Sequence, residues 1–78
     1  MKSYFKRYRR KAASEYLKDR WGIERAPSTL AKYACLGGGP RFESAGRVPL
    51  YPEPELDEWA QSILSPLRRS TSDHGEDG

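Results

Sequence analysis

The chain has 78 residues, of which 36% are hydrophobic and 32% are charged, and its formal net charge is +3. A chain of this length makes one small domain with a limited core, which leaves no room for a large catalytic cleft. No apolar run is long enough to span a membrane, and the start lacks the apolar centre of a signal peptide, so we expect a cytoplasmic protein without a membrane partner.

The beginning of the chain is basic and aromatic. Its first eleven residues interleave six basic side chains with three aromatic ones. Two interpretations stay open: residues 1–9 form either an arm along the phosphates of a nucleic acid, or a solvated leader whose rings cover the edge of the core. In the first interpretation, the backbone contacts come from Lys6, Arg7, Arg9, Arg10 and Lys11.

A first helix is predicted over residues 10–20, because this run is rich in helix-forming residues and has no proline or glycine. Gly22 can end the helix in a left-handed conformation, and Ile23 can pack back against its last turn. An apolar stripe at helical spacing should face the core. Its members are Ala13, Tyr16 and Leu17, and Trp21 could extend it.

A second helix is predicted over residues 27–36, with a proline in its first turn and three glycines and Pro40 after its end. Its inner side carries Leu30 and Ala34, with Tyr33 at the boundary, and its outer side carries Ser28, Thr29, Lys32 and Cys35. The two hydroxyls can also serve the open amides of the first turn. This outer face suits a DNA major groove, so we interpret the segment as the recognition helix of a helix-turn-helix.

A β-hairpin should follow, with strands over residues 41–44 and 48–51 joined by a tight glycine turn. Pro49 cannot donate to a ladder, which favours an isolated hairpin over the centre of a sheet. Arg41 and Arg47 would flank the tip, where an arginine can enter a minor groove or hold phosphates, or be no more than a solvated charge.

A third helix is predicted, with Glu53 or Pro52 as its cap and Pro54 in its first turn, and it should end near residues 65–66. Its apolar face should close over the first helix and consists of Leu56, Trp59, Ala60 and Ile63. Residues 66–78 should be a disordered acidic tail that could engage a partner. The predicted fold is mainly α with a small β-hairpin, and its domain covers residues 10–65.

Charge is divided unevenly along the chain. Residues 1–51 hold twelve basic and four acidic residues, a net charge of +8, whereas residues 52–78 hold two and seven, a net charge of −5. A basic body attracts a polyanion and steers its approach. Opposite charges at the two ends also make head-to-tail self-association physically reasonable.

Catalytic chemistry finds no support in the sequence. His74 stands alone in a polar tail, and the glycine run lacks the lysine and the following helix of a phosphate-binding loop. Cys35 is the single cysteine, which excludes an internal disulfide and a cysteine-based zinc site, indicates a reducing compartment and favours a packing role. We therefore expect no enzyme activity, no metal and no cofactor.

Six short segments occur in order over residues 10–64. They are Ala12-Ala13 with Tyr16-Leu17, Ser28-Thr29-Leu30-Ala31-Lys32-Tyr33, Gly38-Gly39-Pro40-Arg41-Phe42, Gly46-Arg47-Val48, Tyr51, and Leu56-Asp57-Glu58-Trp59. Together they resemble the small winged helix-turn-helix proteins of the excisionase and AlpA-type regulator class. The chain departs from the common pattern in a longer connection between the first two helices, over residues 18–26.

The resemblance implies a MerR-like winged helix-turn-helix, ordered as helix, helix, two-stranded wing and helix. It assigns major-groove contacts to Ser28, Thr29, Lys32 and Tyr33, and wing contacts to Arg41, Ser44 and Arg47. Members of this class are recombination directionality factors that bind repeated sites in attachment-region DNA, often head to tail. They bend the DNA and help a tyrosine recombinase to excise a phage or another mobile genetic element.

Two alternatives remain beside an excisionase. The same fold serves AlpA-type regulators of transcription, which bind promoter DNA. A protein-binding adaptor, whose tail or leader engages a partner while its basic surface only aids solubility, is the alternative from another class. For the DNA-binding interpretations we expect a bacterial or phage-encoded protein in the cytoplasm, associated with the nucleoid.

Overall fold

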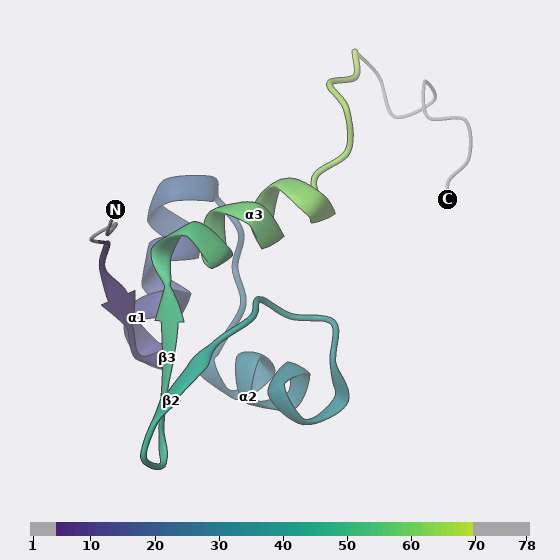
Figure 1. The fold of residues 1–78 in the computed structure, drawn as a ribbon. Helices are drawn as coiled ribbons and strands as arrows, with labels where there is room; N and C mark the ends of the chain where they lie inside the picture. The colour runs from purple at the N-terminus through teal and green to yellow at the C-terminus, as the bar shows by residue number, and fades with distance from the viewer. Residues whose placement is uncertain (1–4, 70–78) are drawn as a thin grey trace.

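The computed structural model describes residues 5–69 of the chain (Figure 1). In chain order the elements are β1 (Arg7–Tyr8), α1 (Arg10–Tyr16), the π-helical turn η1 (Leu17–Trp21), α2 (Pro27–Leu36), β2 (Glu43–Ala45), β3 (Val48–Pro52) and α3 (Glu53–Ile63). Residues 1–4 of the predicted arm and residues 70–78 of the predicted tail lie outside the described residues. Within that range, no helix combines the length and apolar character needed to cross a bilayer.

In the described part of the chain, the hairpin supplies two strands of a three-stranded antiparallel sheet with the order β1-β3-β2. The leader supplies the third strand, because Tyr8 of β1 lies opposite Tyr51 of β3. The prediction of an isolated hairpin is therefore wrong. Pro49 is still tolerated in the central strand: it lies opposite Ser44 of β2, whereas β1 pairs only with the other end of β3.

The first predicted helix is present, but its second half is a π-helical turn, which is wider than the α-helix that the sequence predicted. α1 runs directly into η1, which ends at Gly22 with a left-handed φ of 71°. The amide of Ile23 then donates to the carbonyl oxygen of Leu17 over 3.1 Å, and the Ile23 side chain is buried. Both the glycine cap and the return of Ile23 to the helix are confirmed.

The wider turn brings two donors to one carboxylate oxygen. The Tyr16 hydroxyl donates to Oδ1 of Asp57 over 2.6 Å, and the indole Nε1 of Trp21 donates to the same oxygen over 2.9 Å. Residues five apart are separated by about 140° around an α-helix, but by less around a π-helical turn. The π-helical geometry thus lets both aromatic residues reach α3, which closes over the end of the first helix as predicted.

Tyr16 makes stability sensitive to alkaline pH. Burial raises the pKa of Tyr16 above its usual 10.0, and the hydrogen bond from its hydroxyl to Asp57 and the charge of that carboxylate raise it further. Above pH 10 the unfolded chain loses a proton that the folded chain retains, so rising pH favours unfolding. We expect the melting temperature to fall above about pH 10 and to fall less steeply in Tyr16→Phe.

Thermal denaturation followed by circular dichroism from about pH 8 to about pH 11 measures this effect. Part of the decrease in melting temperature should persist in Tyr16→Phe, because burial and Glu53 also raise the pKa of Tyr8. Equal slopes in the wild type and in Tyr16→Phe would contradict the assignment to Tyr16.

The core lies where the helices meet the sheet. Its buried hydrophobic residues are Ala13, Leu17, Ile23, Leu30, Tyr51, Leu56, Trp59 and Ala60. The predicted apolar faces are confirmed for these residues and for Tyr16, Trp21 and Tyr33, which pack against the core. Ala34 is only half-buried and is not part of this cluster. Ile63 is 40% exposed, because the last turn of α3 extends beyond the helices that it covers (Figure 1).

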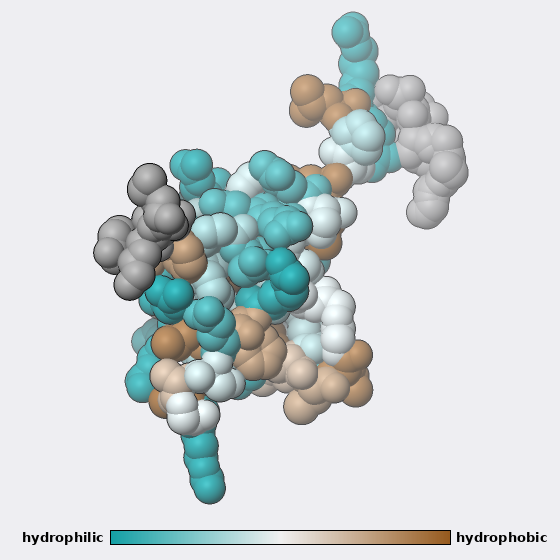
Figure 2. Space-filling model, viewed as in Figure 1, coloured by the Kyte–Doolittle hydropathy of each residue, from teal (hydrophilic) through white to brown (hydrophobic). Residues whose placement is uncertain are grey.

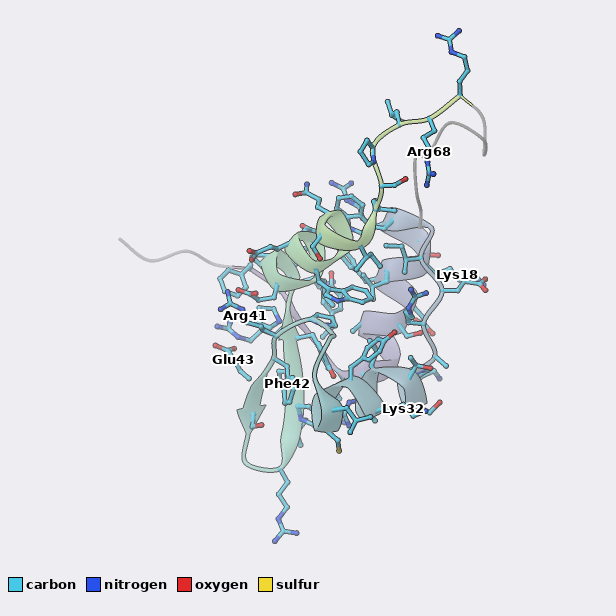
Figure 3. The ribbon with its side chains drawn as sticks, turned by 90° about the vertical axis from the view of Figure 1, so that its right-hand side faces the viewer. Lys18, Lys32, Arg41, Phe42, Glu43 and Arg68 are labelled. Carbon is cyan, nitrogen blue, oxygen red and sulfur yellow. The ribbon has the colours of Figure 1, made fainter. Side chains whose placement is uncertain are left out.

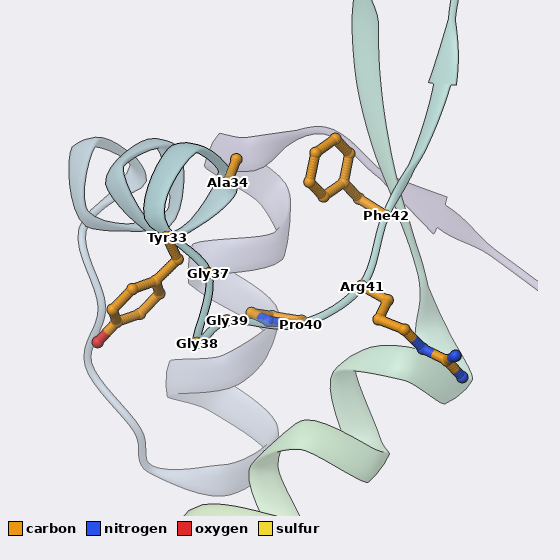
Figure 4. Close-up of a pocket in the computed structure, with 8 residues that line it drawn as sticks. All are labelled: Tyr33, Ala34, Gly37, Gly38, Gly39, Pro40, Arg41 and Phe42. Carbon is orange, nitrogen blue, oxygen red and sulfur yellow. The ribbon is translucent and has the colours of Figure 1, made fainter.

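A glycine turn follows α2 and joins it to the rest of the domain (Figure 4). Gly37 and Gly38 have φ values of 93° and 100°, which residues with side chains rarely adopt. Gly39 is needed for space instead, since a Cβ atom there would lie 2.6 Å from the Cβ of Tyr33. Trp59 of α3 secures the turn by donating from Nε1 to the Gly38 carbonyl oxygen over 2.9 Å.

Gly39→Ala should therefore destabilise the fold by about 1–3 kcal/mol through overpacking against Tyr33. Urea denaturation measures the change. In a double-mutant cycle with Tyr33→Gly, which removes the Cβ as well as the ring next to Gly39, the two costs should not add. Strict additivity, or an unchanged denaturation midpoint for Gly39→Ala, would show that the close approach carries no cost.

Candidate nucleic-acid interface

The outer face of α2 is open to solvent over most of its length. Leu30 is buried in the core, whereas Ser28 and Lys32 are exposed and Thr29 is half-buried. Among the described residues, neither hydroxyl forms a side-chain hydrogen bond, and the first turn is closed by backbone bonds to the Ala26 carbonyl oxygen. The predicted capping role is therefore wrong, and both hydroxyls remain available to a ligand.

Tyr33 does not share this outer face. Its ring packs on the core side of α2 against Trp59, with ring centroids 6.0 Å apart. Cys35, for which the sequence favoured packing, is exposed near the end of the helix. The difference is geometric: Leu30, Tyr33 and Ala34 fill the inner side, and the next residue along the helix turns outward.

Arg41 is not at the hairpin tip, contrary to prediction. A two-residue connection, Gly46-Arg47, joins strands that begin only at Glu43, so Arg41 precedes the hairpin. Its Nε and Nη2 donate to the two carboxylate oxygens of Glu55 over 2.9 and 3.2 Å, and these contacts raise the pKa of Arg41. Figure 4 shows the side chain turned toward the start of α3. Arg47 is exposed in the tip as predicted, and Ser44 is exposed in β2.

In the predicted arm, some residues contact the rest of the domain and others are exposed to solvent. Arg7 forms an ion pair with Glu43, with Nε 2.7 Å from Oε1, and Lys6 lies over the Tyr8 ring, 5.6 Å from its centroid. Tyr8 packs against the core and against Tyr16. Of the leader's rings, that of Tyr8 does cover the edge of the core. Lys11 is exposed near the start of α1.

One surface cavity of about 330 Å³ is lined by Arg9, Arg10 and Arg47. Val48 and Pro49 complete its lining. Among residues 5–69, none of these three arginines forms an ion pair, whereas Arg7 and Arg41 do. The sequence did not indicate this grouping, because it depends on β1 holding the leader against β3. The only feature of the sequence that could have indicated this cavity was the basic character of the leader.

Lys32 of α2 and Arg47 of the hairpin tip lie at the opposite end of the molecule from the acidic helix α3, whereas Arg41 contacts that helix. In both Figure 1 and Figure 3, α2 and the hairpin tip share one end, and α3 lies at the other. The carboxylates of α3 come from Glu53, Glu55, Asp57 and Glu58. Figure 2 shows hydrophilic side chains over α3 and at the hairpin tip, and a hydrophobic area toward the end of α2. Leu36, at that end, is 78% exposed.

Residues 5–69 contain no group of three or more histidine, cysteine, aspartate or glutamate side chains placed to hold a metal ion. His74 lies outside this range. Comparison with protein-family models, curated proteins and solved structures finds no match. What the chain binds is therefore inferred from its own side chains.

Proposed function

We propose that this protein is a sequence-specific DNA-binding architectural factor of the winged helix-turn-helix type, acting as an excisionase. One observation carries the proposal: the polar outer face of α2 and the hairpin tip with Arg47 lie at one end of the domain, and the acidic α3 lies at the other. A polyanion would orient such a molecule with α2 and the hairpin toward itself.

Recognition would divide between two elements. Ser28, Thr29 and Lys32 can offer hydroxyls and an ammonium group to base edges in a major groove. Arg47 can hold the backbone phosphates beside the neighbouring minor groove while the hairpin tip enters that groove. The other basic side chains would neutralise phosphates and release counterions, which supplies affinity without reading the sequence.

One domain of this size reads only a short site, so several protomers on repeated sites would be needed for useful specificity. Opposite charges on α3 and on the α2 end favour contacts between neighbours bound head to tail. A bent array beside an attachment sequence would help a tyrosine recombinase to excise a mobile element, in the cytoplasm of a bacterial host.

A protein-binding adaptor is the second candidate, and a specific feature favours it. The segment after α3 exposes two leucines: Leu64 is 49% exposed and Leu67 is fully exposed. Such a segment suits a partner with an apolar groove.

A gel-shift assay tests the proposal by measuring binding of the protein to the intergenic DNA beside its gene and to attachment-region DNA. Circularly permuted probes report bending, and excess non-specific competitor isolates sequence-specific binding. Stepwise, competitor-resistant shifts whose mobility depends on probe position would support an architectural excisionase. Specific shifts without bending would favour a transcriptional regulator of AlpA type. A salt-sensitive smear alone would refute sequence-specific recognition and leave the adaptor.

A further inference from the structure

Three arginines line one hollow without a counter-charge. Arg9 and Arg10 come from the start of α1, and Arg47 comes from the hairpin tip. The residues of the described chain that line the cavity include no carboxylate. An anion bound in this hollow would be surrounded by three basic residues and no acidic one, which favours its binding.

Arg10 is held in place by the core. Its Nε donates to the Tyr51 hydroxyl over 3.1 Å, and Tyr51 is 1% exposed. Tyr51 is itself fixed by its pairing with Tyr8 and by the Phe42 ring, whose centroid lies 5.5 Å from its own. With Nε engaged, the two Nη groups of Arg10 remain to bind a ligand.

The chemistry of the lining selects an oxyanion. Guanidinium groups donate parallel hydrogen bonds to phosphate oxygens, which makes arginine the preferred residue for phosphate recognition. Val48 and Pro49 add apolar side chains that suit the carbon atoms of an attached sugar. A phosphodiester flanked by sugars matches both parts of the lining.

We infer that this cavity binds one backbone phosphate of double-stranded DNA, with Arg9, Arg10 and Arg47 as its ligands and Tyr51 as the residue that positions Arg10. The inference rests on the proposed function and names a contact within it. The site contains residues from both the leader and the hairpin. A phosphate bound there would therefore also set how deeply the hairpin tip enters the DNA groove.

The salt dependence of DNA binding tests this site. The slope of log affinity against log salt concentration falls by about 0.9 for each phosphate that the protein no longer neutralises. Because the three arginines share one phosphate, the triple glutamine variant should lower the slope by about 0.9. A decrease of roughly three times that amount would mean three separate phosphates and would overturn the inference, as would an unchanged slope. Arg68→Gln is the matched control, because Arg68 lies beyond α3 at the far end of the molecule (Figure 3).

A measurement without duplex DNA separates this inference from the proposed function. In an NMR titration with a dinucleotide phosphodiester, the Nε–Hε signals of Arg9, Arg10 and Arg47 should shift along one binding curve, while that of Arg68 stays still. A uniform shift of all arginine signals would overturn the site even if the protein binds DNA. Tighter binding of inorganic phosphate than of the dinucleotide would also overturn it, by assigning the cavity to a free anion.

Tyr51→Phe tests the positioning role. The variant keeps every charge, so the slope should not change, but affinity should fall by about three- to tenfold. Circular dichroism confirms that the variant is folded. Unchanged affinity in a folded Tyr51→Phe protein would remove Tyr51 from the site.

Discussion

Replacing Lys32 and Arg47 together by glutamine should weaken sequence-specific DNA binding by about a hundredfold or more. Lys32 is exposed on the outer face of α2 and Arg47 is exposed at the hairpin tip. The double variant therefore tests both of the elements that we propose contact DNA. Removing a base contact costs affinity and sequence preference together, whereas removing a phosphate contact costs affinity alike on all sequences. Gel-shift titration against specific and non-specific duplexes measures both quantities.

Arg41→Gln is the decisive control for this experiment. The sequence assigned Arg41 to the wing, but its guanidinium is held by the Glu55 carboxylate. We expect its replacement to change DNA affinity by less than about twofold, and stability to change little because the ion pair is exposed to solvent. If Arg41→Gln weakened binding as much as the double variant, the division of the arginines into paired and unpaired groups would be wrong.

Leu56→Ala should strongly destabilise the fold. Leu56 is 0% exposed in α3, and truncation of such a side chain costs about 2–5 kcal/mol through reduced burial and a residual cavity. A single small core rarely supplies more than about 3–5 kcal/mol in total, so the variant should be largely unfolded at physiological temperature.

Leu36→Ala is the same chemical change at an exposed position. Leu36 is 78% exposed, so its truncation should alter stability by no more than about 0.5 kcal/mol. Urea denaturation of both variants compares them directly. Similar decreases in stability would mean that Leu36 is covered in solution, for example by another protomer.

Local signals in the sequence were enough to predict the helices. Pro27 and the glycines after Leu36 mark the two ends of α2, and the bounds of that helix are confirmed. Pro54 and the acidic first turn mark the start of α3, which begins at Glu53 as predicted. Each of these signals acts within a few residues of the boundary that it sets, so no tertiary contact is needed to read it.

Pairings between distant segments could not be predicted in the same way. The strand at Arg7–Tyr8 needs β3 as its template, and the ion pair of Arg41 needs Glu55 brought close by the glycine turn. Neither partner is indicated by spacing along the chain. The same limit applied to the candidate site, where the outer face of α2 followed from helical periodicity but the meeting of Arg10 with Arg47 did not.

The π-helical turn η1 affects how many residues lie between α1 and α2. A backbone bond that spans five residues instead of four accommodates one additional residue in a helix without breaking it. Insertion of a single residue into a regular helix would produce this geometry, and here the turn directs Tyr16 and Trp21 to Asp57. Homologues in which the first helix stays regular should be one residue shorter between Tyr16 and Gly22, and should lack the paired donors on that carboxylate.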